Sequence, residues 1–385
     1  MSSPFRGAAP RAFARFGLVL LLAATLLTFA PSAAARPGER HVVPVLVPDL
    51  DDMSLLAFWV ARGAGYFESE GVDVQPVAPP ERRMMTELFP SSGVAAAVLT
   101  GQEYTRLLAN EAPILLAANL LENDPAALVL RRDTVARIHA NTAMPLERRL
   151  HLMRDLEMAV ALPERTRLYS LFFAGHEDVN QARIYVAKPE EIARALGEGK
   201  IDGAYVSSPL LERAVAEQDG VVLVSPPDGE VPGFGKRVAL ALAVTRAFAK
   251  AEPAAAAALV RAIGRAEALV RANPKAAAIA LERALPQTKP GRLERIAEIY
   301  RHAVPRTPAI DPKRIPRELE FFPAGVTPPD LAKVNLASFV LPAPPVASTG
   351  LGARGVLALG GGAVLLFALL VAFFESRERA ERAES

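Results

Sequence analysis

The feature that most constrains this chain is a regular alternation of short apolar runs with helix-period segments between residues 41 and 245. The runs are rich in Val, Ile, Leu and Ala, and each is followed by a segment in which apolar residues recur at helical spacing. Strands that alternate with helices form parallel pairs, because a parallel pair needs a crossover connection. The sequence therefore predicts an α/β fold with wound, mostly parallel sheets.

Two series of these elements can be distinguished, which predicts a two-lobed architecture. The first series has predicted strands at residues 41–47, 72–77, 94–99 and 114–119, and predicted helices at 54–63, 81–89 and 102–110. The second has predicted strands at residues 158–162, 183–187, 202–206, 221–224 and 237–244, and predicted helices at 146–156, 164–173, 189–196 and up to Glu217. We assign residues 36–130 to lobe 1 and residues 131–245 to lobe 2, which are ordinary domain sizes.

The pattern becomes purely helical over residues 246–340. One apolar stripe at helical spacing runs from Leu259 to Val270, and further helical segments follow at residues 275–285 and 291–303. We expect this helical block to pack back on the two lobes. Prolines become frequent after Pro305, and residues 341–354 have the composition of a stiff, exposed linker.

The N-terminus has the pattern of a secretory signal peptide over residues 1–35. Three arginines precede an apolar run at residues 16–30, and small residues follow at 32–35. An uncleaved anchor is the alternative, but the apolar run is shorter than the ~20 residues of a spanning helix.

The C-terminus is predicted to hold a transmembrane helix over residues 355–374, a stretch without charge. Its length suffices to cross a hydrocarbon core of ~30 Å at ~1.5 Å per residue. Three arginines lie in the following tail of residues 375–385, so the positive-inside rule places that tail in the cytoplasm. A buried core helix is the alternative, although only the charged tail follows it. We therefore expect a single-pass protein of the cell membrane, with the binding domain in the periplasm or extracellular space.

Charge and cysteine content narrow the classes of function. Lys plus Arg (44) nearly balances Asp plus Glu (42), and a net charge of +2 provides no broad basic surface, so we expect no nucleic-acid partner. The chain has no cysteine, which excludes disulfide frameworks, thiolate metal sites and the lipid-modified cysteine of a lipoprotein.

The usual catalytic motifs are not found in the sequence. The five histidines are scattered without an HExxH pattern, neither Gly-Lys pair belongs to a P-loop, and there is no GxSxG elbow and no GxGxxG after a strand. We therefore expect a protein that is not an enzyme and that has no catalytic residues, no metal and no cofactor.

Polar residues follow several predicted strands, where ligands bind in two-lobed α/β proteins. The candidate ligand-binding residues are Asp49, Asp51, Asp52, Ser54, Thr100, Gly101, Gln102, Arg165, Thr166, Ser207 and Ser208. A second interpretation of Asp52, Ser54, Thr100 and Ser208 is helix capping, and Arg165 is equally compatible with a solvated surface. The aspartates favour a cationic group on the ligand, Arg165 favours an anionic group, and both together suit a zwitterion.

Residues 58–74 (FWVARGAGYFESEGVDV) resemble the opening helix and second strand of the nitrate, sulfonate and thiamine-pyrimidine group of ABC-transporter substrate-binding proteins. Similarity to the same group continues at residues 112–132, at residues 196–209 (LGEGKIDGAYVSSP) and at residues 247–284. The resemblance extends over residues 41–340. It implies a type II periplasmic-binding fold that closes on a small polar organic ligand and delivers it to an ABC permease.

The chain departs from this group at three places. Residues 163–166 (PERT) replace the Gly-Ser/Thr turn that often opens the first helix of lobe 2, and the acidic loop at residues 49–52 replaces a largely neutral one. A C-terminal membrane helix is unusual in the group, and in a chain without cysteine it would substitute for a lipid anchor. A membrane-tethered ligand sensor, or an enzyme that reuses the fold, is the alternative function.

Overall fold

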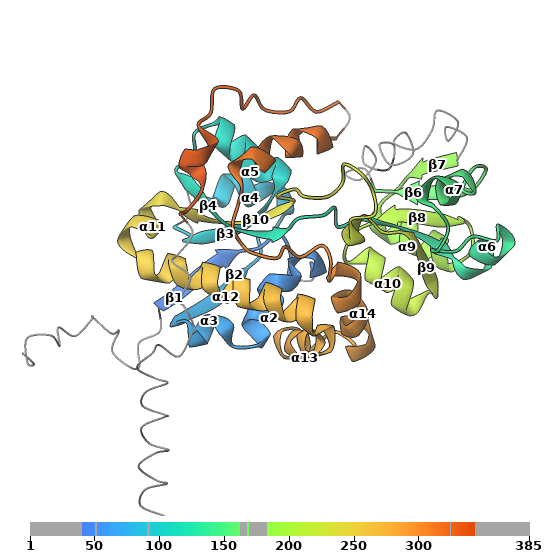
Figure 1. Cartoon of the computed structure of the whole chain (residues 1–385), viewed down its shortest axis with the longest axis horizontal. Coiled ribbons are helices and arrows are strands. Elements are labelled where there is room, and N and C mark those ends of the chain that lie inside the picture. Colours follow the sequence, from blue (N-terminus) through green and yellow to red (C-terminus); the bar gives the residue numbers. More distant parts are fainter. Residues whose placement is uncertain are drawn as a thin grey trace, which may run out of the picture. The chain divides into compact units, whose positions relative to one another are not determined.

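Two five-stranded sheets form the framework in the computed structural model of the chain (Figure 1). The structure describes residues 41–50, 52–90, 93–161, 168, 183–323 and 325–342. Contacts divide the chain into a unit of Met1–His41 and a unit of Val42–Ser385. Apart from His41, both sheets belong to the second unit.

The first sheet has the strand order β2-β1-β3-β10-β4. Its strands are β1 (His41–Leu46), β2 (Val72–Val77), β3 (Ala96–Thr100), β4 (Ile114–Leu121) and β10 (Leu240–Thr245). The strands β1 and β3 pair in parallel, whereas β10 runs antiparallel to both β3 and β4. A strand from late in the sequence thus completes the sheet of the first lobe.

The second sheet has the strand order β7-β6-β8-β5-β9. Its strands are β5 (Ala127–Arg131), β6 (Glu157–Val160), β7 (Arg183–Val186), β8 (Gly203–Val206) and β9 (Gly220–Val224). The strand β6 is parallel to β7 and β8, while β5 is antiparallel to β8 and β9.

Both sheets are mixed, which the expectation of mostly parallel sheets did not include: β10 runs against β3 and β4 in the first sheet, and β5 runs against β8 and β9 in the second. The chain crosses between the lobes twice, at residues 122–126 and at residues 225–239. A strand that arrives from the other lobe runs opposite to the strand that leaves for it, which explains the directions of β5 and β10. The strand predicted for lobe 2 at residues 237–244 corresponds to β10, which lies in the first sheet because it pairs with β3 and β4.

Helices cover both faces of the first sheet (Figure 1). Val43 and Val45 of β1 pack in one core cluster with α2 (Leu56–Gly63) and α12 (Pro253–Ala272). Leu46 and Leu99 lie in another cluster with Tyr104 of α5 (Gly101–Ala109). The alternation of side chains along β1 thereby fills both faces. Two further helices, α13 (Pro274–Ala284) and α14 (Pro290–Tyr300), continue the layer of α2 and α12.

The second sheet is also covered on two faces. The helices α9 (Pro189–Gly197) and α10 (Leu210–Glu217) share the core cluster of α2 and α12, so that one apolar core is continuous between the lobes. The helix α7 (Leu146–His151) packs on the opposite face. The shorter elements are α3 (Tyr66–Ser69), α4 (Met85–Leu88), α6 (Arg132–Arg137), α11 (Arg246–Ala251), η1 (Met53–Leu55), η2 (Arg82–Met84), η5 (Pro226–Asp228), η6 (Pro312–Phe321) and η7 (Leu336–Phe339).

Several sequence predictions fall outside the described residues. They are the signal peptide at 1–35, nearly all of the helix at 164–173, most of the linker at 341–354, the membrane helix at 355–374 and the tail at 375–385. Among the residues that the structure describes, no helix combines the length and the apolar character needed to cross a membrane.

The close approach of α2 to α13 depends on Gly63. A Cβ atom at this position would lie 1.8 Å from the carbonyl oxygen of Ala280 and 3.1 Å from the backbone nitrogen of Ala284. Backbone atoms of a helix cannot yield as a flexible side chain does, so any larger residue would push the two helices apart.

We expect Gly63→Ala to lower the free energy of unfolding by about 1–3 kcal/mol, the usual cost of overpacking. The matched control is Gly291→Ala in α14, where an added Cβ meets no atom within 4 Å. This control should leave stability unchanged or raise it by up to ~1 kcal/mol, because Ala is the better helix former. Urea unfolding of both variants provides the test, and equal stabilities would contradict the close helix contact.

Candidate functional site

The structure brings together polar residues that follow β1 and β8, one strand from each sheet. The backbone N–H of Met53, the first residue of η1, donates to the Oγ of Ser208 at 2.8 Å. Ser208 lies between β8 and α10. This hydrogen bond therefore links the two lobes at the strand ends, where the sequence predicts ligand-binding residues.

On the side of lobe 1, Asp52 and Ser54 form one hydrogen-bonded unit. The Oδ1 of Asp52 accepts from the backbone N–H of Ser54 at 2.9 Å and from its hydroxyl at 2.5 Å. The backbone carbonyl of Asp52 accepts from the indole N–H of Trp59 at 2.9 Å. Asp52 caps η1, so the capping interpretation is correct for this residue. Both Asp52 and Ser54 are buried.

On the side of lobe 2, Ser208 is bonded to a buried carboxyl group. Its hydroxyl donates to the Oε1 of Glu212 at 2.6 Å, and Arg292 Nη2 lies 3.8 Å from the same oxygen. Glu212 is fully buried, and its Oε2 has no hydrogen-bond partner among the described residues. Ser208 makes no side-chain cap on α10. We call Asp52, Ser54, Ser208 and Glu212 the junction cluster.

Burial dominates the electrostatics of the junction cluster. It raises the pKa of Glu212 from 4.5 to about 7, against the opposing effects of the Ser208 hydrogen bond and the Arg292 charge. Burial also raises the pKa of Tyr300 well above its ordinary value, and the charges of Glu212 and Asp52 add to that shift. Near neutral pH, Glu212 therefore gains or loses a proton, whereas the hydroxyl of Tyr300 stays protonated.

The residues after β3 interact mainly within α5 and with the C-terminal segment. Thr100 and Glu103 form a complete capping box, with a bond of 2.8 Å from the Thr100 N–H to Glu103 Oε2. The capping interpretation is thus correct for Thr100 as well. Gln102 donates through Nε2 to the carbonyl of Phe321 at 3.1 Å, and Gly101 lies against Glu318.

Arg82 lies between the loop after β1 and the first turn of α5. Its Nη1 is 3.7 Å from Asp52 Oδ2, and its Nε is 4.0 Å from Glu103 Oε1. The Arg82 side chain is 52% exposed, so it remains accessible to a ligand from solvent. Arg82 and Glu212 are not among the residues predicted from the sequence. Arg82 lies in the loop region after β2, just as the other candidates lie after their strands. Glu212 lies one helical turn after Ser208. These two positions in the sequence pattern are the signals that could have identified both residues.

The remaining predicted residues are not part of the cluster as described. Asp49 is exposed and Ser207 is partly exposed. Asp51, Arg165 and Thr166 lie outside the described residues. Within the described ranges no group of three or more His, Asp or Glu side chains is arranged to hold a metal ion. The described groups are carboxylates, hydroxyls and one accessible guanidinium, which can bind a ligand by charge and hydrogen bonds.

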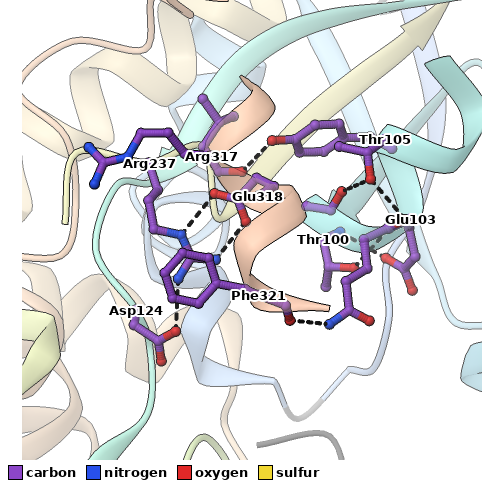
Figure 2. A network of polar contacts seen from close by, with 12 residues as sticks. Thr100, Glu103, Thr105, Asp124, Arg237, Arg317, Glu318 and Phe321 are labelled. Atoms are coloured by element: carbon purple, nitrogen blue, oxygen red, sulfur yellow. Dashed lines mark hydrogen bonds and ion pairs between the residues drawn. The ribbon is translucent and has the colours of Figure 1, made fainter. Parts of the chain in front are cut away.

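A second polar network lies beside α5, and Figure 2 shows it around Glu318. Arg237 donates through Nη1 to Asp124 Oδ2 at 2.9 Å, and through Nε and Nη2 to the two oxygens of Glu318 at 2.9 and 2.6 Å. All three side chains are at most 3% exposed. Burial opposes the charge of Arg237, but Glu318 and Asp124 outweigh it and raise the pKa of the guanidinium. We call Asp124, Arg237 and Glu318 the Arg237 network.

Comparison with known proteins identifies the family. The family model described as NMT1-like matches residues 52–284, which include the whole junction cluster. The chain belongs to the NMT1-like family. The family-level resemblance seen in the sequence is thereby confirmed. No curated protein matches this NMT1-like chain in sequence.

Solved structures show how widely the fold of this NMT1-like protein occurs. A putative periplasmic sulfonate-binding protein, SsuA, from Methylobacillus flagellatus has 15% identity and a TM-score of 0.53 over 79% of this chain and 92% of its own. The aliphatic sulphonate binding protein SsuA from Escherichia coli has 12% identity and a TM-score of 0.51 over 73% and 90%. A variant of DszB in complex with biphenyl-2-sulfinic acid has 12% identity and a TM-score of 0.51 over 79% and 97%. These likenesses show a periplasmic-binding-protein-like fold.

The raised pKa of Glu212 predicts a stability that depends on pH. Between pH 4.5 and about 7 the unfolded chain ionises Glu212 while the native state keeps its proton, so the free energy of unfolding falls as pH rises. The contribution of this group should decrease by roughly 3 kcal/mol across that window. Glu212→Gln should lose this component, because the amide does not titrate.

Chemical denaturation at a series of pH values measures the effect. Glu217→Gln is the matched control, since Glu217 is an exposed residue on the same helix and should keep the slope of the wild type. A Glu212→Gln variant with an unchanged pH profile would show that Glu212 ionises normally in the native state.

Proposed function

We propose that this NMT1-like protein is an extracytoplasmic solute-binding protein of an ABC import system and not an enzyme. It captures a small polar organic ligand between the lobes and delivers it to an ABC permease in the membrane. The observation that carries the proposal is the contact of Met53 with Ser208, because it places the polar strand ends of two sheets against each other. The shared fold of two sulfonate-binding proteins supports the same conclusion.

The charges at the junction support a ligand with a cationic group. The carboxylate of Asp52 lies within the cluster, and Asp49 and Asp51 precede it in the sequence. Arg82 beside Asp52 offers a cation for an anionic group. We propose a zwitterion or an amine as the ligand class, with Arg165 and Thr166 as further contacts from lobe 2.

A thermal-shift screen of the full chain tests this function. The panel contains small amines, carboxylates, sulfonates and zwitterions of matched size. A true ligand at 100 times its dissociation constant stabilises the native state by ~2.7 kcal/mol. Uptake of the labelled ligand by cells with and without the protein then separates transport from sensing. Consumption of the ligand by the purified protein would support the enzyme alternative, a reaction on the fold it shares with DszB.

We predict that the double variant Asp49→Asn, Asp51→Asn binds the ligand found in this screen about tenfold more weakly, a loss of about 1.4 kcal/mol. Three aspartates within four residues repel one another, and a bound cationic group would offset that repulsion. The control variant Asp133→Asn, Asp219→Asn removes the same charge from exposed positions in lobe 2. Titration calorimetry, with a melting curve for each variant, decides the matter, and wild-type affinity in the first variant contradicts the prediction.

We further propose that residues 1–35 are removed and that residues 355–374 anchor the protein as a single-pass membrane protein with a cytoplasmic tail. Protease added to spheroplasts should then degrade residues 36–350, because they lie outside the membrane. Truncation after Pro345 should release a folded protein from the membrane fraction. Retention of the truncated protein in that fraction would contradict a single C-terminal anchor.

A further inference from the structure

The Arg237 network connects three parts of the chain that are distant in sequence. Asp124 lies in the first crossing between the lobes, and Arg237 lies in the second. Glu318 comes from η6, which follows the residues matched by the family model. A buried guanidinium is strongly unfavourable without such partners. The arrangement of both crossings therefore depends on a carboxylate supplied by the C-terminal segment.

The element η6 also contacts both lobes through apolar and polar groups. Ile315 packs in the core cluster of β3 and α5, whereas Phe321 packs in the cluster of the second sheet. The Phe321 ring lies 3.4 Å from the Arg237 guanidinium carbon, and Arg317 donates to the carbonyl of Gly233 at 3.2 Å. The segment thus bridges the lobes at the crossings and covers the guanidinium (Figure 2).

Glu318 occupies a position suited to an anion. Its two oxygens receive the Nε and Nη2 hydrogens of Arg237, the two-point geometry by which arginine binds carboxylates. A Cβ on Gly101 would lie 2.2 Å from Glu318 Oε2, so the absence of a side chain there makes room for the carboxylate.

We propose that η6 is a latch, in which Glu318 serves as a built-in anionic ligand of Arg237 and holds the two crossings in one arrangement. Lifting the latch frees the crossings to move and exposes a site for a small carboxylate on Arg237. The latch works within the chain whether or not the protein carries a solute, so its failure and the failure of the proposed function are separate results.

The test uses the full chain with Glu318→Ala and hydrogen–deuterium exchange followed by mass spectrometry. We expect exchange in residues 122–126 and 234–239 of the crossings and in the first turn of α5 to increase about tenfold, the change that about 1.4 kcal/mol produces. Strands β1 and β3 and the helix α12 should keep their wild-type exchange. Glu320→Ala is the matched control, because Glu320 is exposed on the same element.

Sodium formate then tests the anion site directly. In Glu318→Ala, formate should restore slow exchange in the crossings and raise the melting temperature, whereas sodium chloride at the same concentration should not. Glu320→Ala and the wild type should not respond. Glu318→Gln keeps the shape without the charge and carries the exchange test if the Ala variant does not fold.

Three results would overturn the proposal. If the crossings of Glu318→Gln exchanged at the wild-type rate, the charge of Glu318 would not be what holds the crossings in one arrangement. A uniform increase that includes β1, β3 and α12 would show that Glu318 contributes only to global stability. Equal responses of Glu318→Ala to formate and chloride would show that Arg237 offers no site for a carboxylate.

Discussion

The buried guanidinium of Arg237 is the group on which the arrangement of the two lobes depends. Moving such a charge out of water costs several kcal/mol, and only well-placed carboxylates offset that cost. Asp124 and Glu318 supply them from two other segments, so none of the three segments can shift without leaving a charge unpaired. The topology makes this possible, because β4 and β10 are neighbours in the first sheet and bring the two crossings together.

The junction cluster contributes a weaker and more adjustable contact between the same lobes. It consists of hydrogen bonds between Met53, Ser208 and Glu212, and its carboxyl group changes charge near neutral pH. A hydrogen bond of this kind contributes about 0.5–1.5 kcal/mol, less than a buried ion pair loses when one partner is removed. The lobes are therefore joined by buried ion pairs at the crossings, by weaker hydrogen bonds at the strand ends, and by the apolar core that α9 and α10 share with α2 and α12.

The sequence predicted those parts of the fold that depend on local periodicity. The strand predicted at 72–77 is β2, and the helix predicted at 189–196 is α9. The strand β5 was missed because its residues continue an apolar stretch that begins at β4, interrupted only by a short polar loop. The sheet to which β10 belongs was also predicted incorrectly. Pairing with distant segments decides which sheet a strand joins, and the strand's own hydrophobic pattern does not.

The candidate site shows the same division between local and distant effects. Capping of η1 by Asp52 and of α5 by Thr100 follows from local sequence. Arg237 and Glu318 are 81 positions apart in the sequence, and no short sequence motif predicts that they pair. Because Glu318 already neutralises Arg237, that guanidinium attracts no anionic solute while the latch is closed. Of the described groups, Asp52 and Glu103 are acidic and Arg82 is the accessible base beside them, whereas Arg292 lies beside Glu212. The two carboxylates beside Arg82 therefore favour the cationic end of the proposed ligand.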